Sequence, residues 1–192
     1  MAVQGAVSEH ADALRAAGQQ MGIDVQVVHV RMPADLEGLA GLILPGGEST
    51  TMSRLLRSSG LQPILLERGG KDLALFGTCA GMILLCRDAV HDVADKDIQL
   101  LGLLDATVDR NAFGRQKDSF ETDLEVEGIG KIHAVYIRAP VLTKVWGDTK
   151  ALAHSNRGIV AAQKGRILAT AFHPELSPSL AMHEAFLRLC QG

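Results

Sequence analysis

The chain has 192 residues, of which 47% are apolar and 21% are charged, and its net charge is −3. This length accommodates one well-filled core, so we expect a single domain over residues 1–192. The weak negative charge gives no basis for nucleic-acid binding, and without an apolar run of about 20 residues or a basic leader the sequence predicts a cytoplasmic protein that does not enter membranes.

The N-terminal half alternates helical and strand-like segments. Spacing of apolar residues and the positions of glycine and proline predict these elements in chain order: a helix over 10–21, a strand over 25–30, a strand over 42–44, a helix through 52–56 that Ser49 and Thr50 can cap, a short helix over 61–67 and a strand over 73–76. The strands are almost continuously apolar. This pattern is typical of a parallel sheet covered by helices on both faces.

The C-terminal half is richer in strands. Strand-like runs occur over 122–126, 133–138, 151–154, 159–163 and 167–172, and a last helix is expected over 180–189. Lys164-Gly165 suits a two-residue hairpin turn, so we expect this half to be mostly antiparallel. The sequence thus predicts an α/β domain with a mostly parallel central sheet, flanking helices and additional antiparallel strands.

The pentapeptide Gly77-Thr78-Cys79-Ala80-Gly81 lies between a predicted strand and a predicted helix. A nucleophile elbow has this form, because its sharp turn requires small residues on both sides of the nucleophile. A helix N-terminus would also favour the thiolate of Cys79 over the thiol. The alternative is a buried cysteine that happens to lie between two glycines in a turn.

An attacking thiolate needs a base and a group that orients the base. His173-Pro174-Glu175 follows a predicted strand, and residues two apart in an extended chain face the same side, so Glu175 can orient His173. A surface turn is the alternative interpretation. We expect the other histidines to be packing or solvated residues: His10, His29, His91, His133, His154 and His183.

The segment from Pro45 to Thr51, with the adjacent residues Gly46 and Gly47, also joins a strand to a helix. Adjacent glycines let backbone N–H groups face an anion, as in an oxyanion hole, although a capped turn explains most of the same residues. Of the three cysteines, Cys86 is expected on the same helix as Cys79 as a small core residue. No disulfide framework, metal-ligand spacing or phosphate-binding motif is present, so we predict no metal and no other cofactor.

Together these segments resemble the class I, triad-type glutamine amidotransferases, which have a flavodoxin-like α/β fold. The resemblance extends over nearly the whole chain and narrows to the glutaminase subunits of pyridoxal 5′-phosphate synthases. It is carried by 44–52, 76–82, 110–116, 118–120, 136–140, 171–176 and the segment that begins at Gln4. Such proteins begin with a full apolar strand, whereas only Met1-Ala2-Val3 precede Gln4, so the first strand is expected to be short.

The resemblance implies a Cys79-His173-Glu175 triad that hydrolyses L-glutamine through a glutamyl thioester. Gly47 and Ala80 would supply the oxyanion hole through their backbone N–H groups. The implied glutamine contacts are Gly47, Glu48, Ser49, Arg110, Ile137 and Arg138. Surface ion pairs are the alternative role for the two arginines.

The resemblance also implies a partner, a (β/α)8-barrel synthase subunit that receives the ammonia in a hetero-oligomeric complex. The expected function is therefore glutamine hydrolysis for vitamin B6 synthesis, with weak activity before the partner docks. Two alternatives remain open at this point. One is a triad glutaminase that serves another pathway, and the other is a non-enzymatic redox-sensor or chaperone domain with an elbow cysteine.

Overall fold

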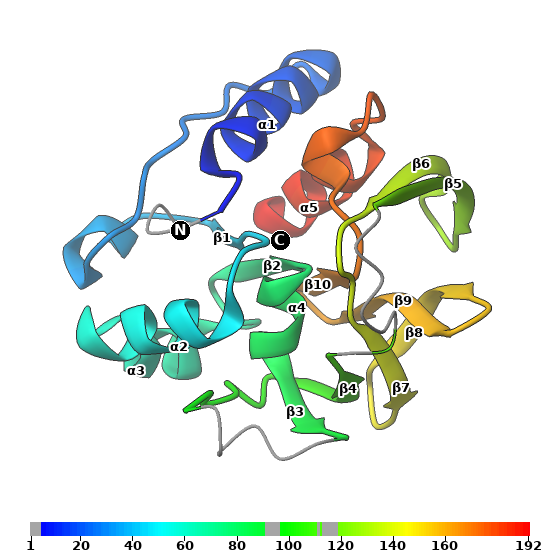
Figure 1. Ribbon diagram of the computed structural model, residues 1–192. Helices are drawn as coiled ribbons and strands as arrows, with labels where there is room; N and C mark the ends of the chain where they lie inside the picture. Colours follow the sequence, from blue (N-terminus) through cyan, green and yellow to red (C-terminus); the bar gives the residue numbers. More distant parts are fainter. Residues whose placement is uncertain (1–4, 91–96, 111, 113–118) are drawn as a thin grey trace.

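The computed structural model describes residues 5–90, 97–110, 112 and 119–192 (Figure 1). In this part of the chain the helices are α1 (Val7–Met21), α2 (Ser49–Ser58), α3 (Leu61–Arg68), α4 (Ala80–Leu85) and α5 (Ala181–Gln191), with the short 3-10 helices η1 (Pro33–Leu36) and η3 (Pro174–Leu176). The strands are β1 (Gly41–Leu44), β2 (Ala74–Thr78), β3 (Cys86–Ala89), β4 (Leu104–Asp109), β5 (Phe120–Val126), β6 (Gly130–Tyr136), β7 (Val141–Val145), β8 (Lys150–Ser155), β9 (Gly158–Lys164) and β10 (Ile167–Thr170).

The main sheet has the strand order β1-β2-β10-β9-β7-β4-β3, with β8 paired to β9, and β5 and β6 form a separate hairpin. Strand β2 is parallel to both β1 and β10, and β3 is parallel to β4. The antiparallel pairs of the main sheet all involve β7, β8 or β9. The α/β class and the additional antiparallel strands of the C-terminal half are therefore confirmed.

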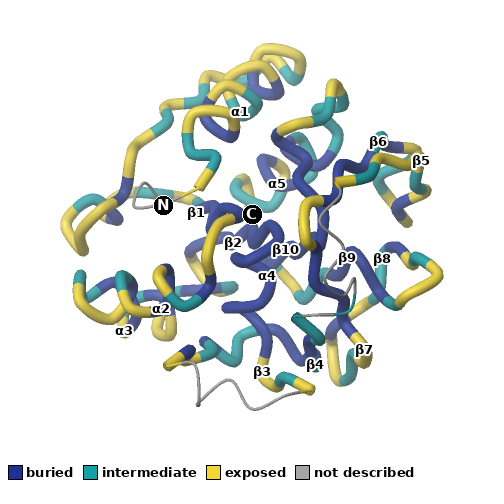
Figure 2. The backbone as a smooth tube through the Cα atoms, viewed as in Figure 1, coloured by how far each residue is buried: buried dark blue, intermediate teal, exposed yellow. Residues whose placement is uncertain are grey.

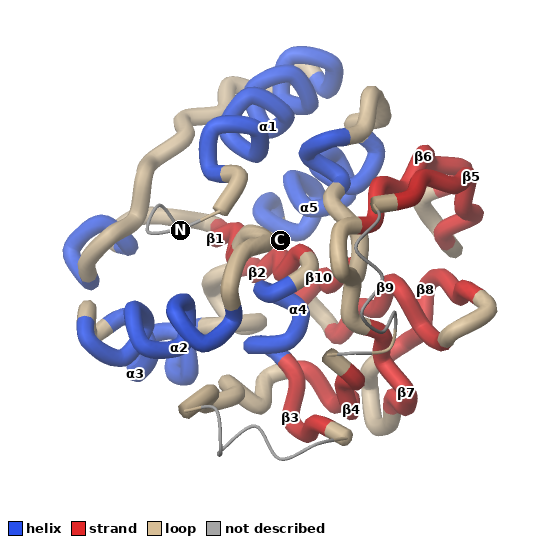
Figure 3. Tube along the Cα trace, viewed as in Figure 1, coloured by secondary structure: helices blue, strands red, loops and turns tan. Residues whose placement is uncertain are grey.

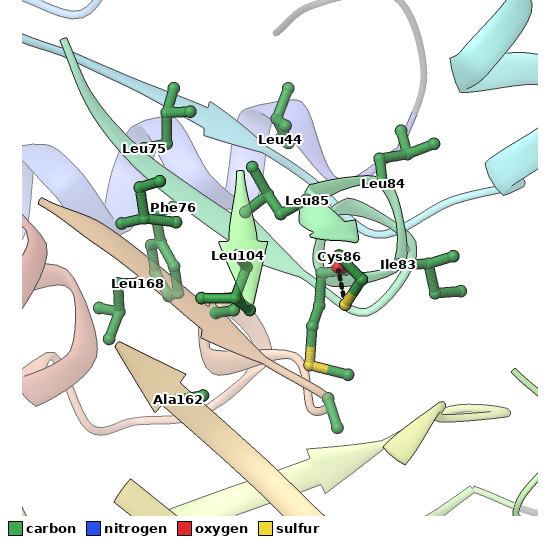
Figure 4. Packing of buried hydrophobic residues seen from close by; sticks show 14 of the residues in the cluster. Leu44, Leu75, Phe76, Ile83, Leu84, Leu85, Cys86, Leu104, Ala162 and Leu168 are labelled. Carbon is green, nitrogen blue, oxygen red and sulfur yellow. Dashed lines mark hydrogen bonds between the residues drawn. The ribbon is translucent and has the colours of Figure 1, made fainter. Parts of the chain in front are cut away.

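Helices cover both faces of the parallel strands (Figures 1 and 3). On one side α1 and α5 lie side by side and α5 packs on β1 and β2, while α4 packs on the same strands from the other side and contacts α2. Alternate residues of β1 face opposite sides of the sheet. On one side a Cβ on Gly41 would meet the Phe186 ring of α5, and on the other side Leu44 contacts Gly81 of α4. The strands between these layers are buried (Figure 2), and their leucines pack with Phe76 and the residues of α4 (Figure 4).

The expected strand over residues 25–30 is wrong. These residues are described, and their exposure alternates as in a strand from Ile23 to Val28, but they form no ladder. A cavity of about 300 Å³ lies between this segment and β1, lined also by α1 and α5. Alternating burial alone does not make a strand, because the backbone groups also need a neighbouring strand within hydrogen-bonding distance.

Three strands were not expected from the sequence: β3, β4 and β7. The first of them corrects the position of Cys86, because α4 ends at Leu85 and Cys86 begins β3. Cys86 is nonetheless the buried core residue that was expected, and its thiol donates to the carbonyl oxygen of Met82 at 3.2 Å (Figure 4). Burial raises the pKa of this thiol far above its usual range, so Cys86 is held as an inert thiol.

Candidate active site

Cys79 occupies a sharp turn between β2 and α4, with φ 49° and ψ −104°. A residue with a side chain rarely adopts a positive φ, and such strain at one position costs about 1–3 kcal/mol. The flanking glycines make the turn possible. A Cβ on Gly77 would lie 2.7 Å from the backbone of Gly81, and one on Gly81 would lie 1.9 Å from the carbonyl oxygen of Leu44. The elbow predicted for this pentapeptide has the backbone that such a turn requires.

His173 and Glu175 lie next to the elbow, just beyond the end of β10. The backbone N–H of Cys79 donates to the carbonyl oxygen of Thr170 at 2.8 Å, which fixes the elbow to β10. His173 Nδ1 and Glu175 Oε1 are 2.8 Å apart, and both side chains are buried. The backbone differs from the expected extended form, because Glu175 belongs to η3. The 3-10 turn folds the carboxylate back onto the imidazole, so the pair forms although its predicted backbone is wrong.

The imidazole of His173 hydrogen bonds with the Cys79 side chain as well as with Glu175. Burial disfavours the charged imidazolium, but the bonds with Cys79 and Glu175 outweigh it and raise the pKa of His173 to about 10. Cys79, His173 and Glu175 therefore form one continuous chain of polar contacts. The Cys79 Sγ also lies 3.9 Å from the carbonyl oxygen of Ile137.

The glycine loop after β1 forms one wall beside His173. A Cβ on Gly46 would lie 2.3 Å from Cε1 of the His173 ring, so only glycine lets the loop and the imidazole approach this closely. Gly5 makes a similar approach from the N-terminal side, since its Cβ would lie 1.9 Å from the Gly46 carbonyl oxygen. The loop, the histidine and the start of α1 are thus packed together at the carboxyl ends of β1, β2 and β10.

Glu48, not Ser49 or Thr50, caps α2. Its carboxylate accepts from the backbone N–H groups of Thr50 at 3.0 Å and Thr51 at 2.7 Å. Partial burial raises the pKa of Glu48, but these hydrogen bonds are stronger together and lower it from 4.5 to about 2. The next residue, Ser49, accepts a 2.9 Å hydrogen bond from Arg110, whose guanidinium also feels the Glu48 charge. The predicted contacts Glu48, Ser49 and Arg110 therefore lie close together.

Replacing Glu48 by alanine should lower the free energy of unfolding by about 1 kcal/mol at pH 7, as for other lost N-caps. Because the pKa of Glu48 is lowered on folding, the carboxylate stabilises the native state above pH 4.5 and loses this effect as the pH falls toward about 2. Urea unfolding of both proteins between pH 7 and pH 3 measures the difference. The difference in the free energy of unfolding between the two proteins should become smaller from pH 7 to pH 3. Glu37→Ala, at an exposed position, is the matched control.

Ile137 and Arg138 follow the end of β6 at Tyr136, and the fold brings this strand end beside His173. The backbone N–H of His173 donates to the carbonyl oxygen of Val135 at 2.8 Å, and Ile137 approaches Cys79 through its own carbonyl. Arg138 has φ 47° and is exposed, as is Ile137. A non-glycine residue in this conformation next to a nucleophile is a feature of functional sites. Ile137 thus lies beside Cys79, and Arg138 is the next residue of the chain.

Several residues of the sequence motifs lie outside the described part of the chain. These are Met1 to Gln4, His91, Asn111 and residues 113–118. The expected short first strand and most of the segment that follows Arg110 are among them. Arg110 and Phe120, which lie on either side of residues 111–118, are described.

Two buried histidines of the site were missed from the sequence. His10 on α1 and His183 on α5 were expected to be ordinary packing or solvated residues, but their rings are 3.0 Å apart at the nearest nitrogens. His10 Nε2 also lies 3.3 Å from Oε2 of Glu175. They are separated by 173 positions in the sequence, so no local spacing could reveal the pair.

Within the residues that the structure describes, no group of three or more histidine, cysteine or acidic side chains is arranged to hold a metal ion. In the same residues, no helix has both the length and the apolar character needed to cross a membrane.

An α/β sheet that presents cysteine, histidine and glutamate at the carboxyl ends of its parallel strands has the architecture of a triad-type amidotransferase. Comparison with known proteins agrees with this class. The model of the SNO glutamine amidotransferase family matches residues 1–192. The chain belongs to this family.

Relatives of known name and structure are similar over almost the full length. The "Pyridoxal 5′-phosphate synthase subunit PdxT" of Methanoregula boonei is 52% identical, over 98% of this chain and 95% of the relative. The protein of the same name from Methanopyrus kandleri is 48% identical, over 97% of this chain and 96% of the relative. A solved structure titled "Crystal structure of glutamine amidotransferase" is 43% identical with a TM-score of 0.86, over 100% of this chain and 97% of that one.

A more distant structure shares the fold. It is described as a GMP synthase protein from Thermoplasma acidophilum and is 18% identical, with a TM-score of 0.62. The match covers 94% of this chain and 88% of that one.

Proposed function

We propose that this chain hydrolyses L-glutamine to L-glutamate and ammonia, and that a partner subunit uses the ammonia to make pyridoxal 5′-phosphate. The observation that carries the proposal is the contact chain from Cys79 through His173 to Glu175 at a strained elbow. The names of the relatives that match nearly the whole chain support the pathway. The chain would act as one glutaminase domain over residues 1–192.

The first half of the reaction forms a thioester. The Cys79 sulfur attacks the amide carbon of the glutamine side chain while the proton that it shares with His173 resides on Nε2, since Nδ1 faces Glu175. The carbonyl oxygen becomes negatively charged, and the backbone N–H groups of Gly47 and Ala80 stabilise it. Comparable donors are worth roughly 3 to 4 kcal/mol each. The carbon–nitrogen bond then breaks while His173 protonates the leaving nitrogen, which departs as ammonia.

The second half releases glutamate. Neutral His173 takes a proton from a water molecule, whose oxygen attacks the thioester carbon of the glutamyl group on Cys79. The carbon–sulfur bond breaks, glutamate leaves, and the proton returns to the Cys79–His173 pair. Because the pKa of His173 is raised to about 10, the Cys79–His173 pair retains a proton at neutral pH. This proton is available for the leaving nitrogen of the next glutamine. Glu175 holds the imidazole in the tautomer with Nε2 toward the sulfur.

Glutamine presents an ammonium and a carboxylate, so its site needs an acceptor and donors. We assign Gly47, Glu48, Ser49, Arg110, Ile137 and Arg138 to this site. The Arg110 hydrogen bond to Ser49 and the position of Ile137 beside Cys79 support the assignment. Glu48 already accepts three hydrogen bonds within α2. It therefore acts on the substrate ammonium mainly through its charge, which its lowered pKa preserves at neutral pH.

The partner in this proposal is a synthase subunit with a (β/α)8 barrel, and the two proteins form a cytoplasmic hetero-oligomer. Glutamate release should rise several-fold when that subunit is added, and pyridoxal 5′-phosphate should form from glutamine without free ammonia. Size-exclusion chromatography and a coupled glutamate assay measure both. A chain that neither associates with the synthase nor supports glutamine-dependent product would contradict the pathway but not the hydrolysis.

A further inference from the structure

A buried polar chain continues behind Glu175, away from Cys79. Glu175 uses Oε1 for His173, and its other oxygen, Oε2, faces His10 Nε2 at 3.3 Å. The same His10 nitrogen lies 3.2 Å from Thr78 Oγ1, and His10 Nδ1 lies 3.0 Å from His183 Nε2. The side chains come from neighbouring elements, since α1 and α5 lie side by side and α5 packs on β2 (Figure 1).

The hydrogen bonds are consistent with one set of tautomers. In the described part of the chain the buried Glu175 Oε2 has no hydrogen-bond partner, and its 3.3 Å contact with His10 Nε2 favours an N–H on that nitrogen, because a ring lone pair would repel the carboxylate. His10 Nδ1 is then an acceptor, and His183 Nε2–H donates to it. This leaves His183 Nδ1 as a bare acceptor, and this atom indeed has no partner among the described residues. Protein interiors tolerate an unpaired acceptor better than an unpaired N–H.

Burial keeps both outer histidines uncharged. His10 is 3% exposed and His183 is 0% exposed. Burial lowers the pKa of His10 well below 6.5 and that of His183 to about 4. A neutral imidazole presents one N–H to Glu175 without adding a positive charge that would compete with His173. The carboxylate charge therefore remains available to the imidazole that takes the Cys79 proton.

We propose that His10, held by His183, is a positioning residue for the triad: its Nε2–H faces Oε2 of Glu175, and this polar contact holds the carboxylate so that Oε1 can orient His173. The inference rests on the proposed glutaminase function and extends it to a five-residue chain, Cys79-His173-Glu175-His10-His183. Neither helix that supplies the outer histidines contributes a triad residue. Their packing is thereby coupled to the geometry of the nucleophile.

His10 also has a packing role, because its ring meets the edge of Phe76 at a centroid distance of 6.3 Å. The test must therefore separate the polar contact of Nε2–H with Glu175 from the volume of the ring. Leucine at position 10 keeps apolar packing but removes the N–H, whereas glutamine places an amide N–H near the position of Nε2. Phe186→Leu is the matched control for packing, since Phe186 contacts Phe76 from α5 without touching Glu175.

The experiment measures glutamate release with the synthase subunit present for wild type, His10→Leu, His10→Gln, Phe186→Leu, Glu175→Gln and the double variant of His10→Leu with Glu175→Gln. His10→Leu should lower kcat on the order of 10-fold with little change in KM, as for residues coupled in one network. His10→Gln should recover part of this loss. In the Glu175→Gln background, His10→Leu should change kcat less than about twofold. Phe186→Leu should lower Tm and leave kcat unchanged.

Two results would overturn the positioning role. One is a folded His10→Leu protein with wild-type kcat, and the other is an equal loss of kcat with and without Glu175→Gln. If His10→Leu does not fold, His183→Leu replaces it in the same cycle and is judged by the same two results. An inactive wild-type protein would instead contradict the proposed glutaminase function, so the two failures are distinguishable.

Discussion

The Cys79→Ala protein should release no measurable glutamate from glutamine, a loss of at least about 10⁴-fold in kcat, because removing a nucleophile leaves only binding and oxyanion stabilisation. Nothing else in the described site can replace the sulfur: it lies at the apex of the elbow, beside the imidazole of His173. The assay is glutamate release in the presence of the synthase subunit, with circular dichroism to verify folding.

The other two cysteines are matched controls for this substitution. Cys190→Ala removes a thiol at the end of α5, and Cys86→Ala removes a buried thiol of the core. Both proteins should retain kcat, although Cys86→Ala should be less stable because it leaves a small cavity. Glutamate release by Cys79→Ala at the wild-type rate would show that the sulfur does not attack the amide.

Glu175→Gln is the second large effect, with kcat expected to fall on the order of 10⁴-fold and KM to change little. Glutamine has nearly the shape of glutamate, but its amide cannot stabilise an imidazolium. It would also present an N–H donor or a weaker acceptor to His173 Nδ1, which now faces a carboxylate oxygen at 2.8 Å. His173 would then lose the tautomer that directs Nε2 to Cys79.

The control for Glu175→Gln is Glu184→Gln. Glu184 lies on α5 and pairs with Arg188 at 3.3 Å, near the surface. This substitution removes the same charge from the same side of the sheet but touches no triad residue, so kcat should be retained. Equal effects of the two substitutions would indicate a general loss of charge or stability, and would contradict a specific role of Glu175.

The elbow could be predicted from the sequence because its requirements are local. A sharp strand–turn–helix backbone excludes bulky neighbours, and the clashes that a Cβ would make at Gly77 and Gly81 show the physical reason. The positions of the parallel strands β1 and β2 could be predicted for a similar reason, since strands buried on both faces are continuously apolar. The contact of His173 with Glu175 was also predicted, but through an extended segment instead of the 3-10 turn that forms it.

Features that depend on distant partners could not be predicted. Whether residues 25–30 form a strand depends on a neighbour that local sequence does not reveal. His10 and His183 look like ordinary helix residues until α1 and α5 meet behind Glu175. The cap of α2 was assigned one residue late, because a glutamate side chain is a less common cap than serine or threonine.

Covalent labelling by an electrophile that mimics glutamine tests the central claim most directly, namely that Cys79 attacks bound glutamine. Peptide mass spectrometry should find the label on Cys79 and not on Cys86 or Cys190, whose thiols have raised pKa values through burial. Excess glutamine should slow the labelling. Labelling of Cys79 at the same rate with and without glutamine, or labelling at another cysteine alone, would contradict the account.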